Sequence, residues 1–567
     1  MLQRLIGALT RLFRKCAELA GIFATKFHGA GPDPRLMKGL AHQKAGDLIA
    51  AEQCYTEVLR YSPEHPDALH LLSTVAQRRG ALDQAEEWVR RALKVSPARA
   101  EYCNTLATVL TDMGCHSEAL EILRLGLKAS PDALRLRTNL LFLLQLLPGV
   151  TRELLLAEHI EWAKWHVKSN PAQDTEPVRF QVAAIGKPAE RLRIGYISAD
   201  FCSHPVGRIM SVVLPKHDSE SHEIVCYDNG SRRDDVNTIL RKNCEKWIEI
   251  HDYDDNKLVQ RIRADRLDVL VDLSGHTRGG RLTALGRKPA AVQVEWLGYL
   301  STTGVAAMDW RLTDRRTDPE PHAQGWHVER LWYLPDCLWP WMMWADADRL
   351  DVVEPPSVQN KFITFGSFNT FRKINSRVIA TWADLLNELP EARLRIYGAP
   401  AGRAIELVYD QFEAAGINAD RIDLFASVEY AKYLHAYREI DIALDPFPYC
   451  GGATTCESLW MGVPVITLAG EGGFSRTGAG LLGAIGLDEY IAATTVDYVR
   501  IAARLAQDSE RLSELRRTLR ERVSRSPMAD AEGFVRNLEK AYRGMWRHFV
   551  LSHPDNASFA GNSGLAR

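Results

Sequence analysis

The sequence predicts an array of paired helices followed by two α/β domains. Two observations lead to this fold class. Small and turn-forming residues recur every 34 residues in the first quarter of the chain, and short β-branched runs alternate with helical segments after residue 190. A fixed period of this length is typical of stacked helix pairs. Alternating strands and helices are typical of parallel sheets with crossover helices. The 567 residues are enough for three or more domains of about 100–200 residues.

The repeat is defined by three kinds of residue, each with its own physical reason. Glycine permits the backbone of the turn between two helices, alanine lets the second helix approach the first, and proline ends the unit because it cannot continue a helix. The recurring residues are Gly46, Gly80 and Gly114, Ala51, Ala85 and Ala119, and Pro63, Pro97 and Pro131. We therefore predict helical repeats over residues 34–150, with a concave groove for a partner, and a helical connector over 151–185.

The two ends of the chain are predicted separately. Residues 1–33 place leucines at helical spacing with arginines between them. We interpret them as amphipathic cap helices that cover the first repeat, while a helix lying on a membrane surface stays an alternative. Residues 546–567 are predicted to be a flexible tail. The longest apolar run is far too short to span a bilayer.

Composition narrows the class of protein. The net charge is -2 and no sustained basic tract exists, so we expect no nucleic-acid partner. The ten cysteines form no CxxC pair, which indicates neither a zinc site nor a disulfide framework. Reduced thiols in a cytoplasmic compartment fit best.

The second part of the chain divides into two blocks, residues 186–355 and 356–545, at Pro355-Pro356. Each block repeats the strand–helix alternation. The predicted strands are Leu192–Ile197, Glu223–Tyr227, Asp268–Leu273 and Val292–Leu297, then Phe362–Phe368, Leu394–Tyr397, Ile422–Phe425, Ile442–Leu444 and Val465–Leu468. Two doubly wound domains would face a cleft, and ligands in such sheets lie beyond the carboxyl ends of the strands.

The segment 444–470 carries the most specific signal. A predicted strand runs into a Pro/Gly-rich loop, and Thr454-Thr455 can cap a helix beginning near Cys456. Exposed amides at a helix start bind anions. Glu457, expected in the first turn, can accept hydrogen bonds from ribose hydroxyls. Alternatively, it merely complements the helix dipole.

The segment 362–375 gives a second signal. A predicted strand ends at Phe368-Asn369, and Lys373 follows. A lysine here can neutralise charge on a departing diphosphate. The alternative is an exposed surface lysine, which is the commonest environment for this residue type.

Together with the 34-residue repeats, these segments resemble the O-linked N-acetylglucosamine transferase family. The members of this family join tetratricopeptide repeats to a two-lobed, UDP-sugar-dependent catalytic region of the GT-B type. Further segments fit the pattern, namely residues 195–210, 268–280, 292–304 and 308–314. The resemblance covers roughly residues 35–545. It implies a tetratricopeptide superhelix followed by two Rossmann-like lobes, with the acceptor on 186–355 and the UDP-sugar on 356–545.

The resemblance also implies roles for particular residues. Lys373 matches the phosphate-contacting lysine, Glu457 the acidic residue that holds ribose, and His204 the histidine beside the sugar and acceptor. The remaining implied donor-binding positions are Phe368, Asn369, Thr370, Gly452, Ala453, Thr454 and Thr455.

Three departures from the animal members bear on the donor. Gly452-Ala453-Thr454 stands where they carry His-Thr-Thr, Thr370 stands where they carry Gln, and Tyr433 stands near a position often occupied by His. The resemblance thus implies a UDP-sugar, with UDP-GlcNAc first and UDP-glucose as the alternative. A repeat scaffold whose lobes only bind is a third hypothesis.

The implied reaction is an inverting transfer to a Ser or Thr hydroxyl of a polypeptide held by the repeat arm. We interpret His204 as a positioning group or general base, with Asp265 and His276 as alternatives. Two DxD triplets, Asp252-Tyr253-Asp254 and Asp346-Ala347-Asp348, fall in polar connectors rather than at strand ends. We therefore predict no metal and no cofactor besides the donor.

Overall fold

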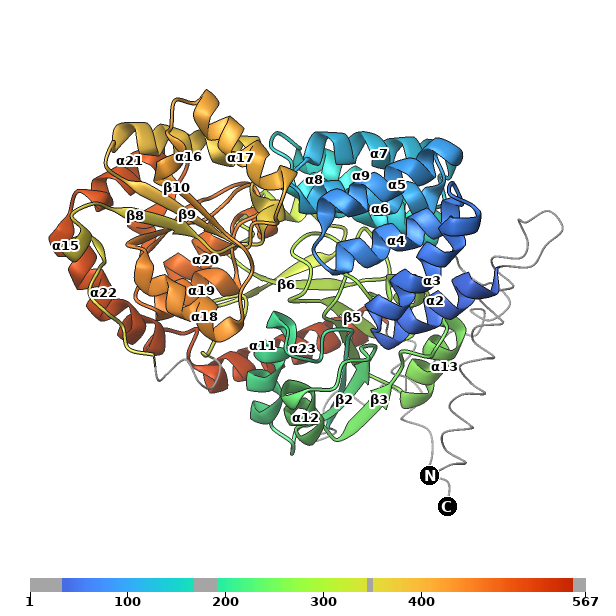
Figure 1. Cartoon of the computed structure of the whole chain (residues 1–567). Coiled ribbons are helices and arrows are strands. Elements are labelled where there is room, and N and C mark those ends of the chain that lie inside the picture. The colour runs from blue at the N-terminus through green and yellow to red at the C-terminus, as the bar shows by residue number, and fades with distance from the viewer. Residues whose placement is uncertain (1–32, 168–190, 344–349, 554–567) are drawn as a thin grey trace, which may run out of the picture. The chain divides into compact units, whose positions relative to one another are not determined.

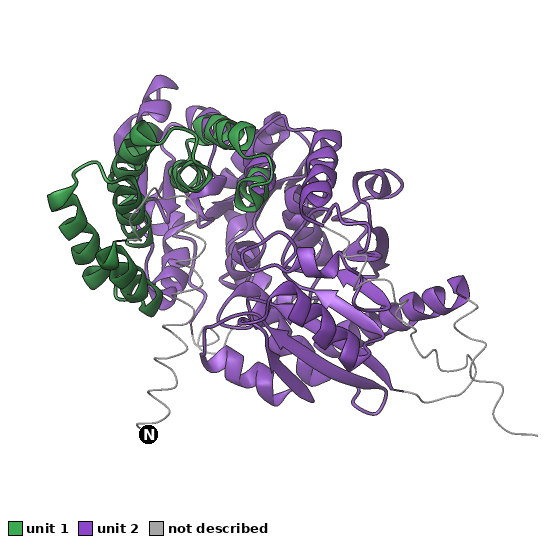
Figure 2. Cartoon of the chain, turned by 90° about the vertical axis from the view of Figure 1, so that its right-hand side faces the viewer, with its two compact units in different colours: residues 1–140, 400–407 green, residues 141–399, 408–567 purple. Residues whose placement is uncertain are grey.

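The computed structural model describes residues 33–167, 191–343 and 350–553 (Figure 1). The chain forms two compact units (Figure 2). Unit 1 comprises residues 1–140 and 400–407, and unit 2 comprises residues 141–399 and 408–567. The predicted cap helices over 1–33 lie outside the described residues, apart from Asp33.

Unit 1 is built from antiparallel helix pairs, as the 34-residue period predicts. Its helices are α2 (Pro34–Ala45), α3 (Leu48–Tyr61), α4 (Pro66–Arg78), α5 (Leu82–Val95), α6 (Ala100–Asp112), α7 (His116–Ala129) and the beginning of α8 (Leu134–Leu146). The recurring glycines Gly46, Gly80 and Gly114 all have left-handed backbone, with φ of 85°, 78° and 80°. The recurring alanines are fully buried. Both roles assigned from the sequence are confirmed.

Helix α4 begins at Pro66. Proline suits the first helical position, and the His65 ring accepts a hydrogen bond from the Ala68 amide at 3.4 Å. Unit 1 also takes in residues 400–407, where the Arg403 guanidinium donates to both carboxylate oxygens of Glu86 at 2.8 and 2.9 Å.

The first lobe of unit 2 is a seven-stranded, wholly parallel sheet. Its strands are β1 (Leu192–Ser198), β2 (His222–Asp228), β3 (Lys246–Glu249), β4 (Val269–Asp272), β5 (Val292–Glu295), β6 (Trp310–Asp314) and β7 (Arg330–Leu334), in the order β3-β2-β1-β4-β5-β6-β7. The accompanying helices are α9 (Arg152–His166), α11 (Pro205–Val213), α12 (Asp235–Lys242), α13 (Asp255–Asp265) and α14 (Leu282–Leu285). The sequence analysis missed β3, β6 and β7.

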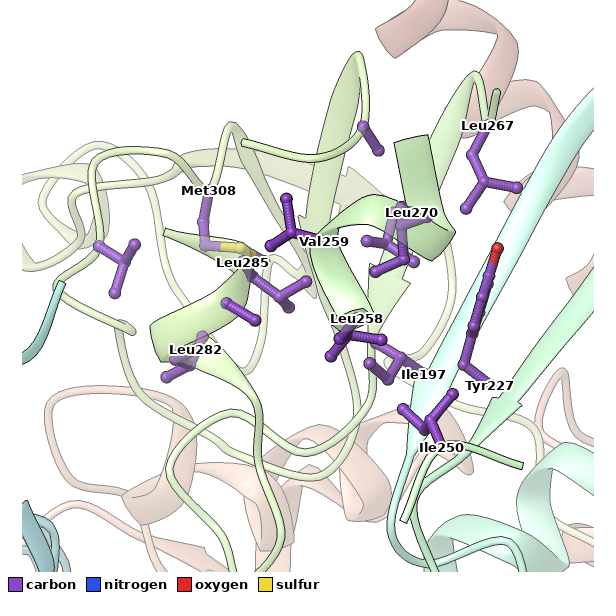
Figure 3. Packing of buried hydrophobic residues seen from close by; sticks show 14 of the residues in the cluster. Ile197, Tyr227, Ile250, Leu258, Val259, Leu267, Leu270, Leu282, Leu285 and Met308 are labelled. Carbon is purple, nitrogen blue, oxygen red and sulfur yellow. The ribbon is translucent and has the colours of Figure 1, made fainter. Parts of the chain in front are cut away.

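One apolar cluster fixes this lobe (Figure 3). Leu258 and Val259 of α13 pack against Ile197 of β1, Tyr227 of β2 and Leu270 of β4. All five side chains are at most 2% exposed. Burial of this kind contributes about 25 cal/mol per Å² of apolar surface, so the helix is held on the sheet by contact with three strands.

The second lobe repeats the same plan with six parallel strands. They are β8 (Thr364–Ser367), β9 (Arg393–Tyr397), β10 (Ile422–Phe425), β11 (Ile442–Leu444), β12 (Val465–Leu468) and β13 (Ile491–Ala492), in the order β10-β9-β8-β11-β12-β13. Its helices are α15 (Ser357–Asn360), α16 (Ser376–Glu388), α17 (Arg403–Ala414), α18 (Tyr430–Ala436), α19 (Ala453–Trp460), α20 (Thr477–Ala484), α21 (Thr495–Ala506) and α22 (Ser509–Ser524).

The last helix, α23 (Ala531–Ser552), corrects the predicted tail. It continues past residue 545, and its apolar face, including Phe534 and Tyr542, is buried. This helix packs against the first lobe, where the Tyr196 hydroxyl donates to the Tyr542 hydroxyl at 3.2 Å. None of the described helices is long and apolar enough to cross a membrane.

Each sheet reverses its strand order once, between β1 and β4 in the first lobe and between β8 and β11 in the second. The crevice outside the carboxyl ends of strands at such a point is where open α/β sheets bind ligands. The predicted site residues follow β1, β8 and β11, so the fold places them at these two points.

Candidate active site

A pocket of about 230 Å³ opens between the two lobes of unit 2. Side chains from both lobes and from the segment that joins them line it. They include His204, Arg208, Leu297 and Leu300 of the first lobe, Trp339, Trp341 and Met343 of the joining segment, and Lys373, Tyr430, Tyr449, Gly452, Ala453 and Glu457 of the second lobe. Five of the predicted site residues thus share one pocket.

Lys373 ends a short 3-10 turn, Phe371–Lys373, just after β8. Its ammonium donates to the Cys450 carbonyl at 2.8 Å and to the Asn369 side-chain oxygen at 3.1 Å, and it lies 4.8 Å from the centre of the Tyr449 ring. Burial lowers the pKa of Lys373, while the nearby Asp445 carboxylate opposes that change. The lysine is held in place, so the interpretation as a freely exposed surface residue is wrong.

Asn369 and the residue after β11, Asp445, form the floor beneath this lysine. Asp445 is 1% exposed. Its carboxylate accepts hydrogen bonds from the Gly451 amide at 2.6 Å and the Asn369 side-chain amide at 3.4 Å. The Thr454 hydroxyl donates to the Asn369 side-chain oxygen at 3.2 Å. Asn369, Thr454 and Thr455 also line a small cavity of about 10 Å³ next to these contacts.

The helix after the glycine-rich loop begins earlier than predicted. α19 starts at Ala453, with Gly452 as its N-cap and no side-chain capping bond. Thr454 and Thr455 therefore lie inside the first turn instead of capping a helix at Cys456, and Glu457 lies in the second turn instead of the first. The amides of a first helical turn have no partner within the helix. Because Gly452 and Ala453 line the pocket, the helix start faces it as an anion-binding element.

Glu457 is held by two tyrosines of α18. The Tyr430 hydroxyl donates to one carboxylate oxygen at 2.8 Å, and the Tyr433 hydroxyl donates to the other at 2.7 Å. Burial raises the pKa of Glu457, and the two tyrosine hydrogen bonds oppose that rise. Each carboxylate oxygen can accept a further hydrogen bond. The Arg208 guanidinium of the first lobe lies 4.5 Å from the centre of the Tyr430 ring, which connects the two sides of the pocket.

Aromatic rings surround Phe368 behind this group. Phe368 stacks on Tyr397 and Tyr437, with ring centres 4.3 and 4.0 Å apart. The two tyrosine rings cover both faces of the Phe368 ring, so Phe368 supports the strand end and offers no free face for stacking. Thr370 is exposed and lines neither cavity.

His204 occupies the N-cap of α11 in the first lobe. Its Nδ1 accepts a hydrogen bond from the Val206 amide at 3.3 Å and lies 3.8 Å from an Asp200 carboxylate oxygen. Burial lowers the pKa of His204, and Asp200 opposes this. A neutral imidazole whose Nδ1 accepts carries its proton on Nε2. The ring therefore presents an N–H donor, in contrast to the lone pair that a general base requires.

Comparison with known proteins places this geometry in a family. The sequence profile for "Glycosyl transferase family 41" matches residues 167–340 and 356–538. The chain belongs to glycosyl transferase family 41. A tetratricopeptide repeat profile matches residues 36–100, which agrees with the helix pairs of unit 1.

Relatives of this family 41 chain include a solved structure and curated plant proteins. A lysine-to-methionine mutant of the O-GlcNAc transferase of Thermobaculum terrenum is 32% identical, covers 91% of this chain and 98% of its own, and superposes with a TM-score of 0.84. The protein SPINDLY of Solanum lycopersicum, described as a probable UDP-N-acetylglucosamine–peptide N-acetylglucosaminyltransferase, is 36% identical over 409 residues, or 70% of this chain and 43% of its own length. SEC of Arabidopsis thaliana, with the same description, is 31% identical over 376 residues, or 63% and 37%. The chain spans about two-fifths of the length of these plant relatives.

The two alternative bases in this family 41 chain lie away from the pocket. Asp265 ends α13, and its carboxylate accepts from the Tyr227 hydroxyl at 2.7 Å and the Arg261 guanidinium at 2.8 Å. His276 is 6% exposed, and its Nε2 bonds the Thr303 carbonyl at 2.7 Å. Burial lowers the pKa of His276 to about 3. Neither residue lines the pocket.

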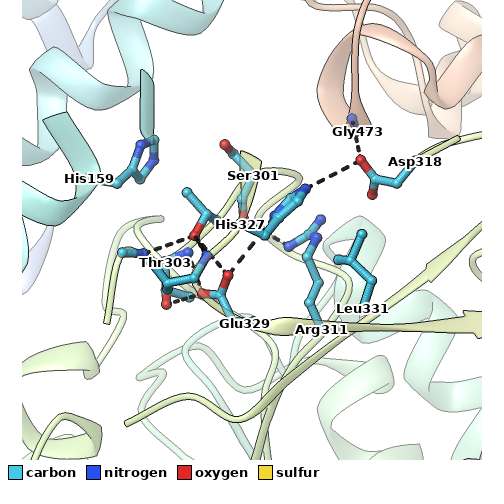
Figure 4. Close-up of polar contacts among 12 residues, drawn as sticks. His159, Ser301, Thr303, Arg311, Asp318, His327, Glu329, Leu331 and Gly473 are labelled. Carbon is cyan, nitrogen blue, oxygen red and sulfur yellow. Dashed lines mark hydrogen bonds and ion pairs between the residues drawn. The ribbon is translucent and has the colours of Figure 1, made fainter. Parts of the chain in front are cut away.

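The first lobe also holds a buried polar network that no local sequence pattern predicts (Figure 4). The Glu329 carboxylate accepts from the Thr302 hydroxyl and the Thr303 amide, both at 2.7 Å. Asp318 accepts from the Gly473 amide of the second lobe at 3.2 Å and pairs with His327 at 3.4 Å. This network joins the lobes rather than lining the pocket.

The described DxD triplet, Asp252-Tyr253-Asp254, uses its two carboxylates for contacts within the protein. Asp254 caps α13 by accepting from the Lys257 amide at 2.8 Å, and Asp252 pairs with His251 at 3.4 Å. The triplet Asp346-Ala347-Asp348 lies outside the described residues. Within residues 33–167, 191–343 and 350–553, no three His, Cys, Asp or Glu side chains are grouped to hold an ion.

Sequence reasoning missed three residues of this site, namely Tyr430, Arg208 and Asp445. Tyr430 and Arg208 line the pocket, whereas Asp445 lies behind it and bonds to Asn369. For Asp445 a signal existed, because an aspartate directly after a strand at the switch point is a frequent ligand position. For Tyr430 and Arg208 the sequence contained no signal, since their contact depends on how two lobes face each other.

Proposed function

We propose that the protein transfers N-acetylglucosamine from UDP-GlcNAc to Ser or Thr hydroxyls of polypeptides, with inversion at the anomeric carbon. The observation that carries the proposal is the convergence of a lysine, a helix start and a buried glutamate on one pocket. Together they complement a diphosphate and a ribose. The descriptions of the related O-GlcNAc transferase and of the plant relatives support the choice of sugar and acceptor.

In the proposed reaction, the acceptor oxygen attacks the anomeric carbon while the bond from that carbon to the diphosphate breaks. The charge that develops on the leaving oxygen is met by the Lys373 ammonium and by the amides at the start of α19. One preorganised donor of this kind typically contributes about 10²–10³ in rate. Glu457 would accept hydrogen bonds from the ribose hydroxyls and fix the nucleoside.

The acceptor proton needs a base, and the pocket offers few. Glu457 is already engaged by two tyrosine hydroxyls, and His204 presents its N–H. We propose that His204 positions the donor by donating a hydrogen bond, and that the departing diphosphate takes the proton. Replacing His204 by glutamine, which can also donate, should then preserve more activity than replacing it by alanine. Equal loss in both variants would restore the general-base role.

The donor sugar is tested directly by incubating the full chain with an acceptor protein and a series of UDP- and GDP-sugars. Mass spectrometry of the acceptor distinguishes an N-acetylhexosamine from a hexose. We expect the N-acetylhexosamine product from UDP-GlcNAc. A hexose product alone would favour the UDP-glucose alternative, and nucleotide binding without any product would favour the scaffold alternative.

We propose further that unit 1 holds the acceptor polypeptide. Support comes from a row of polar side chains along the first helices of successive repeats. Gln43 of α2 donates to Thr74 of α4 at 2.8 Å, and Asn139 of α8 donates to Asn104 of α6 at 2.8 Å. Such side chains can exchange their mutual bonds for bonds to a peptide backbone. Deleting residues 34–131 should impair transfer to proteins more than donor hydrolysis, and equal loss would indicate structural support alone.

We propose a cytoplasmic location. The nine cysteines among the described residues are all free thiols, which suits a reducing compartment. Fractionation of cells that produce the full chain would test this.

A further inference from the structure

We propose that Asp445 is a positioning residue, which acts through Asn369 to aim the Lys373 ammonium at the departing diphosphate. This inference rests on the proposed function of the pocket. Asp445 itself does not line the pocket, so its effect must pass through the side chains that do.

The first step concerns the anchoring of Asp445. Its side chain follows β11 and is 1% exposed. One carboxylate oxygen accepts from the Gly451 amide at 2.6 Å and from the Asn369 side-chain amide at 3.4 Å, and the other accepts from the Thr467 hydroxyl at 2.8 Å. Hydrogen bonds to both carboxylate oxygens fix the plane of the group.

Neighbouring glycines leave the space that this carboxylate fills. A Cβ added to Gly451 would lie 2.9 Å from one Asp445 oxygen, and a Cβ added to Gly478 would lie 2.6 Å from the other. Contacts under 3.0 Å force atoms to move. The nearest atoms to these added carbons are threonine hydroxyls, that of Thr455 at 2.6 Å and that of Thr467 at 2.4 Å, so the two glycines make room for the carboxylate together with the threonines around it.

The second step is the orientation of Asn369. A carboxylate can only accept hydrogen bonds, so the Asn369 NH₂ group must face Asp445. Its oxygen then turns the other way, toward the Lys373 ammonium at 3.1 Å and the Thr454 hydroxyl at 3.2 Å. Without Asp445, the amide could rotate by half a turn and present its NH₂ group to the ammonium.

The third step concerns the lysine. An ammonium has three N–H donors. Within the described residues, two of them serve Asn369 and the Cys450 carbonyl. The remaining donor is left for a ligand, since Lys373 lines the pocket. Fixing two donors determines the direction of the third.

Charge supports the same assignment. The groups that face Lys373 are the Asp445 carboxylate, the Cys450 thiol, the Arg372 guanidinium and the Tyr449 ring. Burial lowers the pKa of Lys373, and Asp445 is the main group that opposes it. Burial also raises the pKa of Cys450 to about 12 and that of Asp445 to about 6. At neutral pH the thiol is uncharged and the carboxylate is mainly ionised, so Asp445 favours the charged form of Lys373.

The experiment uses two aspartates at opposite ends of one strand. Asp445→Asn removes the charge and keeps an oxygen acceptor for Gly451 and Asn369, while an NH₂ group replaces the oxygen that accepts from Thr467. Asp445→Ala removes all of these contacts. Asp441→Asn and Asp441→Ala are the matched controls. Asp441 directly precedes β11, is also 1% exposed, and accepts from the Thr364 and Ser357 amides at 2.8 and 3.0 Å. Burial raises the pKa of Asp441 too.

The first readout is the pH dependence of Lys373 acetylation by acetic anhydride, followed by mass spectrometry on the full chain without nucleotide. Removing the Asp445 charge removes the influence that raises the pKa of Lys373, so the titration midpoint should move to lower pH in Asp445→Asn. Asp441→Asn should leave it unchanged. An unmoved midpoint in folded Asp445→Asn, or an equal shift in both variants, would overturn the inference.

The second readout is steady-state transfer with UDP-GlcNAc. Misplacing a group that acts on the transition state costs up to about 100-fold in rate. We expect Asp445→Ala to lower kcat about 10- to 100-fold with a smaller change in KM, and Asp441→Ala to match wild type per folded molecule. If the wild type transfers no sugar, the proposed function fails, while the acetylation result still decides whether Asp445 governs Lys373.

Discussion

The two lobes of unit 2 share one strand order and use it differently. In the second lobe, the side chains after β8 and β11 keep hydrogen-bonding capacity that faces a pocket, as Lys373 and Glu457 show. In the first lobe, the polar side chains of the segment between β6 and β7 form their hydrogen bonds inside the protein. Glu329 and Asp318 are fully buried and bonded to the protein's own hydroxyls, amides and a histidine (Figure 4).

This difference shows where the function of such a fold is encoded. Both sheets supply a crevice at a topological switch point, yet the chemistry depends on the few residues that follow the strands and on whether their bonds are already satisfied. A satisfied network stabilises the lobe. Donors that keep a hydrogen bond to give can bind a ligand. Variants in the two lobes test this difference, because we expect a loss of activity from one lobe and a loss of stability from the other.

The largest expected effect is the loss of turnover in Lys373→Ala. Among the described residues, Lys373 is the only side-chain cation that the second lobe contributes to the pocket lining. Removing one transition-state donor costs about 10²–10³ in kcat. The melting temperature should change little, because the Lys373 ammonium makes two hydrogen bonds and one contact with the Tyr449 ring. Steady-state kinetics and thermal unfolding of the same samples measure both quantities.

Lys361→Ala is the matched control for that variant. Lys361 lies in the same lobe, is exposed, and its ammonium donates to a single carbonyl, that of Val358, at 2.8 Å. It should show wild-type kinetics. Near-normal kcat in Lys373→Ala would show that this lysine of the second lobe does not take part in turnover.

The next largest effect is expected on stability, in Asp318→Asn. The carboxylate accepts from Gly473, from the Thr313 hydroxyl at 2.6 Å and from His327. Hydrogen bonds to a charged group contribute about 1.5–3 kcal/mol each, so the melting temperature at neutral pH should fall by several degrees, as expected for a loss of about 1–3 kcal/mol. The kcat of the folded fraction should stay near wild type, which would mark the network as structural.

The pH dependence of this loss has a definite sign. The contacts with His327 and Thr313 hold the pKa of Asp318 below its ordinary value. A carboxyl with a depressed folded-state pKa stabilises the fold above its unfolded pKa of about 3.9 and loses that contribution as the pH falls further. The melting temperatures of wild type and Asp318→Asn should therefore converge below about pH 4. A gap of constant size would show that the charge of Asp318 is not involved.

A smaller effect is expected from Glu457→Gln in the second lobe. Losing one hydrogen bond to a charged acceptor costs about tenfold in affinity, so the Kd for UDP should rise by about that factor. Wild type should bind UDP more tightly than 2′,3′-dideoxy-UDP, whereas the variant should bind both equally. A preserved preference in the variant, measured by calorimetry, would separate Glu457 from the ribose.

Glu457→Gln also sharpens the contrast in stability. Because burial raises the pKa of Glu457, its folded form binds a proton more readily than its unfolded form, and stability falls as the pH rises through that interval. The amide has no such cost. The melting temperature of the variant should therefore equal or exceed that of wild type at neutral pH, opposite to Asp318→Asn.

The sequence predicts the fold better than the details of the site. The 34-residue period and the strand alternation identify both architectures, and strands such as Ile422–Phe425, Ile442–Leu444 and Val465–Leu468 match to the residue. The strands β6 and β7 were not predicted, because tryptophan, arginine and aspartate interrupt their apolar pattern. The predicted boundary at residue 545 falls inside helix α23, because the apolar face of this helix is covered by a lobe that lies far away in the sequence.

The site could be predicted only where local sequence carries the chemistry. A lysine after a strand and a glycine-rich loop before a helix are visible along the chain, so Lys373 and Gly452 were found. The helix start was misplaced because Thr454-Thr455 resembles a cap, whereas Gly452 takes that position with φ of -123°. Asp445, Tyr430 and Arg208 depend on contacts across 76, 27 and more than 200 residues of sequence, respectively, and no local pattern reports such contacts.

The smallest expected effect is the response to metal removal. Lys373 and the amides at the start of α19 supply fixed positive charge where the diphosphate would leave, which is the task a divalent cation performs in other phosphoryl-leaving reactions. Activity should therefore persist at wild-type level in excess EDTA, measured against an EDTA control with added Mg²⁺. If activity instead requires the cation, the charge supplied by the second lobe is insufficient alone. A divalent cation beside Lys373 would then be needed to neutralise the departing diphosphate.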